Sequence, residues 1–419
     1  MLGFLCADWF STPWGGSPGN LASSDELTGW FVGKLWSQRP ASVKNAASLP
    51  PVVYFAKDAS MAASDYAVPE NLMTDSTPSS ILIIRPSALG DVCRTVPVLA
   101  SLRSAWPEAR IGWLVQEEFS EAVSAHPSLD EVVPFPRQAL RGAWKSPRRL
   151  LKTLSYLRSL SRPGWDIALD CQGLARSGLF ARFSGATRRV GFAKAAELGW
   201  VFLTDRIPAS ERHVVDRTMA LISGLGLPIK MDMRLHVPEL SSQRWSVHPQ
   251  NPAAPYIVLA PRSRWASKEW PRERWCKLMD ALAANGHREF VLVGSPSEQA
   301  SIDEIAASVS ASGVRIASLA GRTSVGELLA IIQGADLVVA NDSAPLHIAV
   351  GFSRPMIGLF GPTDPEEVGP YGALDQVLRP LTASGSGHDY RAPSTPDNAL
   401  DGIGLDQVLE RALDRLGVR

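Results

Sequence analysis

The stretch Ile81-Leu-Ile-Ile-Arg-Pro-Ser-Ala-Leu-Gly-Asp-Val92 decides the fold of this chain. Its four opening apolar residues predict a strand buried on both faces, and a helical pattern over Val96–Ala105 follows after a turn. Short apolar runs at Ile111–Val115 and Ile167–Asp170 repeat this alternation. Buried strands separated by helices are typical of a parallel sheet covered on both sides. We therefore predict an α/β, doubly wound, Rossmann-like domain.

A second series of the same kind begins after residue 255. Its apolar runs are Tyr256–Ala260, Phe290–Gly294, Leu337–Ala340 and Met356–Phe360. We predict two Rossmann-like domains, at residues 80–240 and 256–381, joined by a polar, proline-bearing linker at 241–255. The two domains are expected to face a cleft, because open parallel sheets bind ligands beyond the carboxyl ends of their strands.

The remaining segments are interpreted from composition and periodicity. Residues 1–79 are rich in Ser, Pro, Ala and Gly and are expected to be a disordered leader or the product of a mis-assigned start, with Met61 or Met73 as the alternative. Residues 382–402 have a similar composition and predict a mobile loop. Residues 403–419 carry apolar residues at helical spacing, which predicts an amphipathic helix that ties the two domains together.

The composition excludes several classes of protein. Of the 419 residues, 45% are hydrophobic and 20% are charged, and the formal net charge is zero. No apolar run reaches the roughly 18 residues that a membrane-spanning helix needs. We therefore expect a cytoplasmic globular protein that binds no nucleic acid. The four cysteines lie far apart, which argues against a disulfide framework or a zinc site.

Asp91 is the candidate catalytic residue. It follows the first predicted strand together with Gly90, which places both residues at the carboxyl edge of the sheet. A carboxylate at this edge can accept the proton of a hydroxyl nucleophile that lies within hydrogen-bond reach. Asp is also a common N-cap, and on spacing alone a cap of a helix that begins near Val92 is the simpler interpretation.

A first candidate phosphate site lies between a strand and the helix that opens at Pro271. A pyrophosphate bound without a metal needs a cation together with hydroxyl and backbone donors. Lys268, Ser263 and Arg264 supply these groups. The alternative is an exposed basic loop that binds no ligand.

A second candidate phosphate site is the strand-to-helix segment Leu337–His347. The backbone N–H groups of Ser343–Leu346, including Ala344, are expected to point at phosphate, and the Asp342 carboxylate can accept from sugar hydroxyls. His347 lies one turn into the helix. An ordinary interior helix residue explains His347 equally well.

Five stretches together resemble glycosyltransferase family nine, whose members attach heptose to the lipopolysaccharide core. They are residues 81–99, Asp170-Cys-Gln-Gly-Leu-Ala-Arg-Ser177, Arg188-Arg-Val-Gly-Phe192, Pro261-Arg-Ser-Arg-Trp-Ala-Ser-Lys-Glu-Trp-Pro271 and Asn341-Asp-Ser-Ala-Pro-Leu-His347. The resemblance covers residues 81–418, and it is specific as a set rather than stretch by stretch. The chain departs from the family at Arg262 and Arg264, where small or hydroxyl residues are usual.

The resemblance implies roles for single residues. Asp91 corresponds to the general base, Lys268 to the lysine that contacts the donor phosphates, and His347 to a residue beside the donor. Glu298 matches the acidic position that holds the nucleotide ribose, although a charge at a helix start explains it equally well. Thr323 ends a loop that resembles the one against which the adenine lies.

The acceptor is expected on the N-terminal domain, where Ser87 and Gly90 border Asp91. Nearby, Arg137–Trp165 contains eight Lys or Arg and no Asp or Glu, interleaved with leucines and aromatic residues. This pattern predicts contact with an anionic membrane surface or a phosphorylated glycolipid, and its alternative is a solvated basic helix. The basic residues singled out are Arg137, Arg141, Lys145, Arg148 and Arg149.

By resemblance the chain has the two-domain GT-B architecture and moves a heptose or related sugar from an ADP-sugar to 3-deoxy-octulosonic acid on lipid A. The transfer would be inverting, would need no metal or cofactor, and would take place at the inner face of the cytoplasmic membrane. The alternatives are a catalytically silent nucleotide-sugar-binding protein and a sugar-nucleotide epimerase of the same architecture. Asp91, Lys268 and Asp342 together argue against the first, and the second leaves the basic segment unexplained.

Overall fold

A computed structural model describes residues 77–142, 146–252, 255–380 and 399–417 of the chain. All of these residues belong to one compact unit. The predicted leader up to residue 76 and most of the predicted loop at 382–402 lie outside the described residues.

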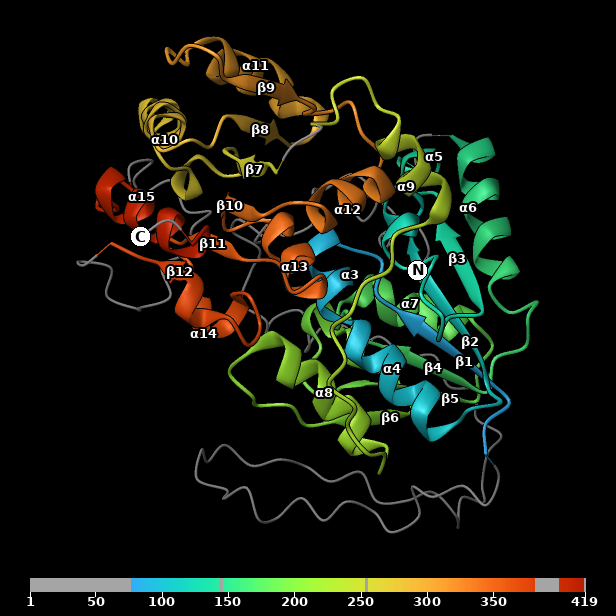
Figure 1. Cartoon of the computed structure of the whole chain (residues 1–419). Helices are drawn as coiled ribbons and strands as arrows, with labels where there is room; N and C mark the ends of the chain where they lie inside the picture. The colour runs from blue at the N-terminus through green and yellow to red at the C-terminus, as the bar shows by residue number, and fades with distance from the viewer. Residues whose placement is uncertain (1–76, 143–145, 253–254, 381–398, 418–419) are drawn as a thin grey trace, which may run out of the picture. The chain divides into compact units, whose positions relative to one another are not determined.

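The N-terminal half of the described chain forms a parallel sheet of six strands in the order β3-β2-β1-β4-β5-β6 (Figure 1). The central strand β1 pairs on both sides, with Ile81 opposite Ile111 of β2 and Ile167 of β4. The strands are β1 (Ser80–Ile84), β2 (Arg110–Gln116), β3 (Glu131–Phe135), β4 (Ile167–Asp170), β5 (Arg188–Phe192) and β6 (Asp205–Ile207). This arrangement is the doubly wound sheet that the sequence predicts.

The C-terminal half repeats the architecture in a second parallel sheet, in the order β12-β11-β10-β7-β8-β9. Leu337 of β10 pairs with Ile257 of β7 at its centre. The strands are β7 (Ile257–Ala260), β8 (Glu289–Leu292), β9 (Arg315–Ser318), β10 (Leu337–Asn341), β11 (Met356–Leu359) and β12 (Val377–Leu378). The prediction of two Rossmann-like sheets is therefore confirmed.

Helices and short 3-10 segments, labelled η, connect the strands (Figure 1). Those of the N-terminal half are α3 (Leu89–Arg94), α4 (Val96–Ala105), η2 (Glu117–Ala122), α5 (Arg137–Leu140), α6 (Pro147–Ser159), α7 (Ala175–Phe183), η4 (Ala196–Phe202) and α8 (Val214–Gly224). The later ones are α9 (Glu239–Ser246), η5 (Ala266–Lys268), α10 (Arg272–Ala284), η6 (Pro296–Glu298), α11 (Gln299–Ala307), α12 (Val325–Gln333), α13 (Ala344–Gly351), α14 (Pro365–Val368), η7 (Leu374–Gln376) and α15 (Leu405–Arg415).

Burial on both faces explains why the strands are continuous apolar runs. Ile81 and Ile83 belong to one hydrophobic cluster, whereas Leu82 and Ile84 belong to another, and all four are fully buried. Side chains alternate between the faces of a strand, so both faces of β1 require apolar residues.

Three segment boundaries differ from the predictions. The 241–255 linker begins inside a helix, α9, because Trp245 is buried and donates a hydrogen bond to the hydroxyl of Tyr256 over 3.3 Å. Ordered structure begins before β1, since the backbone N–H of Ser79 donates to Asp166 over 2.7 Å. The end of the 382–402 loop is also anchored, because Leu400 is fully buried.

Helix α15 does not join the two sheets as predicted. Its main contacts are with α10 and β11, beside which it lies in Figure 1. Val408 and Ala412 are fully buried in the cluster that covers one face of the second sheet. The helical spacing therefore identified an amphipathic helix correctly, but its apolar face completes the core of a single domain.

Candidate active site

Asp91 lies in the first turn of α3, immediately beyond the carboxyl end of β1. The helix begins at Leu89 after Ala88, so Asp91 is its third residue rather than the N-cap of a later helix. One carboxylate oxygen accepts the backbone N–H of Ala88 over 3.3 Å. The same oxygen pairs with Arg85 at 3.0 Å, and the other pairs with Arg94. The Asp91 carboxylate therefore both accepts a backbone N–H at the start of α3 and pairs with two arginines.

The two arginines determine the charge of this carboxylate. Burial raises the pKa of Asp91, but the guanidinium groups of Arg85 and Arg94 outweigh burial and hold the pKa well below its usual range. Asp91 is therefore ionised at neutral pH, which is the form that accepts a proton.

Each arginine is fastened by a different carbonyl. Arg85 donates to the carbonyl of Cys171, and Arg94 donates to the carbonyl of Val368 over 2.7 Å. Cys171 follows Asp170, which holds its own loop by accepting from the hydroxyl of Ser177 at 2.9 Å. Burial raises the pKa of Asp170 to about 6. The two arginines that pair with Asp91 are thus held by carbonyls from different halves of the chain, Arg85 by the first half and Arg94 by the second.

Gly90 and His347 bring α3 against α13. A Cβ atom at position 90 would lie 2.7 Å from Cδ2 of His347, so only glycine allows this approach. His347 is buried, and its Nδ1 has no hydrogen-bond partner among the described residues. Burial lowers the pKa of His347 to about 3, and the positive charge of Arg94 acts in the same direction. The ring is therefore neutral at physiological pH.

Lys268 and Asp342, which the sequence assigns to two separate donor elements, meet in one buried ion pair. Their Nζ and Oδ2 atoms lie 2.6 Å apart, and the two side chains are 10% and 9% exposed. The hydroxyl of Thr363 donates to the same carboxylate oxygen over 2.8 Å. Burial raises the pKa of Asp342, but Lys268 and Thr363 reverse this effect and keep it lowered.

The loop that carries Ser263 and Arg264, the other predicted phosphate ligands, also contains the carboxylate of Glu269. Glu269 accepts the backbone N–H of Ser263 over 3.0 Å and pairs with Arg262 at 2.6 Å. The guanidinium of Arg264 stacks on the Trp265 ring, with 5.8 Å from Cζ to the ring centroid. Lys268 is thus directed at Asp342, whereas the backbone donor of Ser263 is directed at Glu269.

The start of α13 offers fewer backbone donors than expected. Pro345 has no N–H group, and the N–H of Leu346 donates to the carbonyl of Ser343 over 3.2 Å. Among the predicted run, this leaves the N–H groups of Ser343 and Ala344 at the helix N-terminus, where the helix dipole favours an anion.

Asn341 and Thr363 are the residues that sequence reasoning did not assign. The buried amide of Asn341 donates to the carbonyl of Pro261 over 2.8 Å and accepts the backbone N–H of Trp270 over 3.2 Å. It therefore holds both ends of the Lys268 loop. A polar residue that ends an apolar strand was the available signal for Asn341, and the Gly361–Asp364 loop after β11 was the signal for Thr363.

Glu298 and Thr323 lie on neighbouring loops beyond β8 and β9. The Glu298 carboxylate accepts the backbone N–H of Ser295 over 2.7 Å, which is the helix-start interaction that the sequence left as an alternative. Gly321 of the Thr323 loop donates from its N–H to the carbonyl of Gly294 over 3.0 Å. The fold thus joins the loops of the predicted ribose and adenine residues.

The basic segment forms α5 and α6. Arg141, Arg148 and Arg149 are exposed, whereas Lys145 lies outside the described residues. Burial lowers the pKa of Arg137, and the positive charge of Arg264 acts in the same direction.

Two aromatic residues of the basic segment pack inward. Tyr156 packs against Phe135 and Phe180, with ring centroids 5.8 Å and 6.4 Å away, and Trp165 is only 4% exposed beneath Gly112. Trp165 is part of a hydrophobic core cluster, and Tyr156, which is partly buried, packs against that cluster. The exposed apolar residue of α6 is Leu151.

Ser87, an expected acceptor residue, is buried beside Asp91, and its hydroxyl has no hydrogen-bond partner among the described residues. Within residues 77–142, 146–252, 255–380 and 399–417, no group of three or more His, Cys, Asp or Glu side chains is arranged to hold a metal ion. Nor does any described helix have the length and apolar character to cross a membrane.

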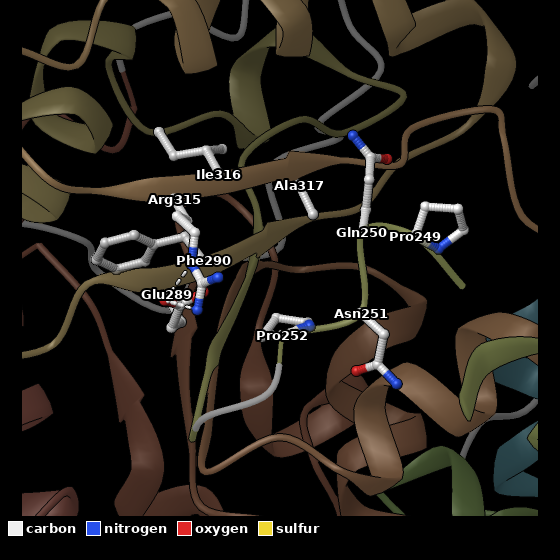
Figure 2. Close-up of a pocket in the computed structure, with 9 residues that line it drawn as sticks. All are labelled: Pro249, Gln250, Asn251, Pro252, Glu289, Phe290, Arg315, Ile316 and Ala317. Atoms are coloured by element: carbon white, nitrogen blue, oxygen red, sulfur yellow. Dashed lines mark hydrogen bonds and ion pairs between the residues drawn. The ribbon is translucent and has the colours of Figure 1, made fainter. Parts of the chain in front are cut away.

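One hollow of about 280 Å³ lies away from these residues, where β8 and β9 begin (Figure 2). Glu289 and Arg315 pair on its wall at 2.6 Å, opposite Gln250 and Asn251. The candidate site lies at the opposite, carboxyl ends of the strands.

Known proteins resemble this chain in both sequence and structure. Residues 153–392 match the family model of glycosyltransferase family 9 (heptosyltransferase). Lipopolysaccharide heptosyltransferase 1 of Pseudomonas aeruginosa is 29% identical over 306 residues, 70% of this chain and 81% of the relative. The Escherichia coli K12 protein of the same name is 28% identical over 71% of this chain and 93% of its own length.

Two solved structures share the fold. E. coli heptosyltransferase WaaC with ADP-2-deoxy-2-fluoro heptose has a TM-score of 0.63 and 25% identity, covering 80% of this chain and 99% of that one. A family 9 glycosyl transferase from Veillonella parvula has a TM-score of 0.69 and 23% identity, covering 81% and 98%. The family model spans more than half of the chain, and this chain therefore belongs to glycosyltransferase family 9, the heptosyltransferases, and is a transferase.

Proposed function

We propose that this enzyme transfers a heptose, with inversion, from ADP-heptose to 3-deoxy-octulosonic acid in the inner core of lipopolysaccharide. The observation that carries the proposal is the direct packing of the Asp91 helix on the helix that follows Asp342, through Gly90 and His347. This packing supports the proposal because it brings the helix that carries Asp91 against the helix that begins just after Asp342.

The proposed reaction is a single displacement. An acceptor hydroxyl attacks the anomeric carbon, the bond from that carbon to the phosphate oxygen breaks, and ADP leaves with the bonding electron pair. Asp91 accepts the hydroxyl proton as the new glycosidic bond forms. The ionised state imposed by Arg85 and Arg94 prepares Asp91 for this step.

The donor is supported by charge at the second sheet. Lys268 and the N-terminus of α13 provide positive potential at the carboxyl ends of β7 and β10, where a leaving diphosphate gains charge. Asp342 orients Lys268 at 2.6 Å, and we infer that it accepts from a donor hydroxyl when the site is filled. These groups perform the charge stabilisation that a metal would otherwise supply, so we expect transfer to continue in EDTA.

The acceptor is supported by the basic helices of the first sheet. Arg137, Arg141 and the exposed face of α6 carry positive charge without acidic residues in the segment. A phosphorylated glycolipid presents the complementary charge, and we place α6 against an anionic membrane surface. We propose that the protein works in the cytoplasm as a peripheral membrane enzyme.

The decisive experiment measures radiolabelled heptose transfer from ADP-heptose to heptose-free lipid A core. Asp91→Asn retains the shape of the side chain but removes the proton acceptor, so we expect transfer to fall by about 10²- to 10⁴-fold. ADP binding, measured by calorimetry, should remain close to that of the unaltered protein.

The matched control is Asp130→Asn, which breaks an arginine pair with Arg103 at the surface, away from the site. It should transfer heptose normally. Full activity of Asp91→Asn would reject the base. Tight ADP-heptose binding without transfer by the unaltered protein would favour a silent binder, and interconversion of the free nucleotide sugar would favour an epimerase.

A further inference from the structure

We infer that Arg94 is a positioning residue that couples the orientation of Asp91 to the donor loop of the second sheet. The inference rests on the proposed transfer reaction and deepens it. Arg94 uses one terminal nitrogen for Asp91 and the other for the carbonyl of Val368, at 2.7 Å. One planar side chain therefore bridges the base and a backbone atom from the other half of the chain.

The two arginines on Asp91 differ in their anchors. Arg85 is tied to the carbonyl of Cys171, which follows β4 of the same sheet, so it moves with Asp91. Arg94 is tied to Val368 at the end of α14, which belongs to the second half of the chain. Of the two arginines, Arg94 is therefore the one that links the carboxylate to the second half of the chain.

The segment that Arg94 contacts also carries a donor-site residue. Thr363, which donates to Asp342, lies five residues before Val368 in the loop that leads into α14. Asp364 in this loop starts α14 by accepting the N–H of Glu366 over 3.0 Å and pairs with Arg212 at 2.8 Å. A donor that reorganises Asp342 and Thr363 thus acts on the segment that Arg94 holds.

The position of Arg94 on α3 suits this role. It lies three residues after Asp91, so the two side chains share one face of the helix. Its side chain is 11% exposed, which limits competition from water. A lysine at this position would keep the positive charge, but it lacks the planar guanidinium group that donates to two acceptors at fixed angles.

The same geometry predicts a change in pH dependence. The charged or titratable groups that face Asp91 are Arg85 from the end of β1, Arg94 from α3 and His347 from α13. Both arginines lower the pKa of Asp91, so removing Arg94 must raise it. The base is active when ionised, so the acidic limb of kcat should move to higher pH.

The test compares Arg94→Gln and Arg94→Lys in heptose transfer, with kcat and donor KM measured across pH. Arg94→Gln should lower kcat by about 10- to 100-fold through misplacement of the base, with donor KM changed by less than about threefold. It should also shift the acidic limb upward. Arg94→Lys should return the limb toward its original position while kcat stays low.

Arg103→Gln is the control, because this arginine also joins an aspartate, Asp130, to backbone carbonyls, but among the described residues it makes no contact with Asp91 or the second sheet. Arg94→Gln with the kcat of Arg103→Gln would overturn the inference. A fall in kcat without a shift of the acidic limb would show that Arg94 has only a structural role and would overturn the inference as well. The same holds if calorimetry shows that the fall in kcat matches a loss of folded protein. Absence of transfer by the unaltered chain would remove the proposed function, and the inference with it.

Discussion

The two halves of the chain each hold a lowered-pKa aspartate just beyond a central strand, but they hold it differently. Asp91 follows β1, is 24% exposed and is paired with two guanidinium groups. Asp342 follows β10, is 9% exposed and is paired with one ammonium group and one hydroxyl, from Lys268 and Thr363. The more accessible carboxylate is thus the one with the greater positive charge around it.

This difference separates two chemical tasks. The proposed base must meet a mobile hydroxyl, and Asp91 fits this role because it has an open side and its two arginines keep it ionised without enclosing it. Asp342 is enclosed, and its strongest contact fixes a lysine in place. One carboxylate is therefore suited to accept a proton, and the other is suited to orient a cation for phosphate.

The largest expected difference between the Asp91 and Asp342 sites is the loss of stability when the positively charged partner of each aspartate is removed. Lys268→Ala leaves Asp342 buried without an ammonium partner, so we expect the free energy of unfolding to fall by about 3–5 kcal/mol. Arg94→Ala should cost clearly less, because Arg85 still neutralises Asp91. Urea unfolding of both variants measures the contrast, with the exposed Lys277→Ala on α10 as control. Equal losses from Lys268→Ala and Arg94→Ala would contradict the distinction.

A smaller effect is expected from the hydroxyl that completes the Asp342 site. Thr363→Val has nearly the same shape but loses the 2.8 Å hydrogen bond to a carboxylate, so we expect about 1.5–3 kcal/mol of destabilisation. Donor KM should rise because Lys268 is less well oriented. Thr187→Val, at an exposed hydroxyl, serves as the control. A normal donor KM together with the full stability loss would show that Thr363 only supports folding.

The smallest effect concerns the internal anion of the Lys268 loop. Glu269→Gln removes the negative charge beside Ser263 and Arg262, so ADP should bind about three- to tenfold more tightly in calorimetry. No such gain in anion binding is expected from a substitution at Asp91, because the two positive charges of Arg85 and Arg94 already exceed its single negative charge. Weaker ADP binding would instead assign Glu269 to shaping the loop. Glu273→Gln, at an exposed position of α10, controls for net charge.

Much of the fold could be read from the sequence because its central strands are buried on both faces. The runs at β1, β2, β4, β7, β8, β10 and β11 have the continuous apolar character that such burial imposes. Strands such as β6 and β12 were missed because they are short and lie at sheet edges, where only two or three residues pair and one side is uncovered. Nothing in their local pattern distinguishes them from loops.

The site divides in the same way between what sequence can and cannot predict. Asp91, Lys268 and Asp342 are candidates from the sequence, because polar residues at carboxyl strand ends and a family resemblance point to them, and their functional roles stay predictions. Their partners were not, because no local pattern shows that Arg94 reaches Val368.

The basic segment shows the limit of periodicity. It indicates that Arg137–Trp165 is helical and basic, but not that Tyr156 and Trp165 face inward. The direction in which an aromatic side chain points depends on what packs against it. Here Tyr156 packs against Phe135 of β3, and Trp165 packs against Gly112 of β2. The sequence therefore indicated the charge of this surface better than its apolar content.

The approach of Gly90 to His347 makes the two positions interdependent over a long separation in sequence. A larger residue at 90 meets the imidazole at once, since even a Cβ would lie 2.7 Å from Cδ2. Such a residue becomes acceptable only if position 347 becomes smaller in the same lineage. In chains that keep this interface, the two positions should therefore co-vary: glycine is expected before the aspartate wherever the matching position of α13 holds a side chain as large as histidine.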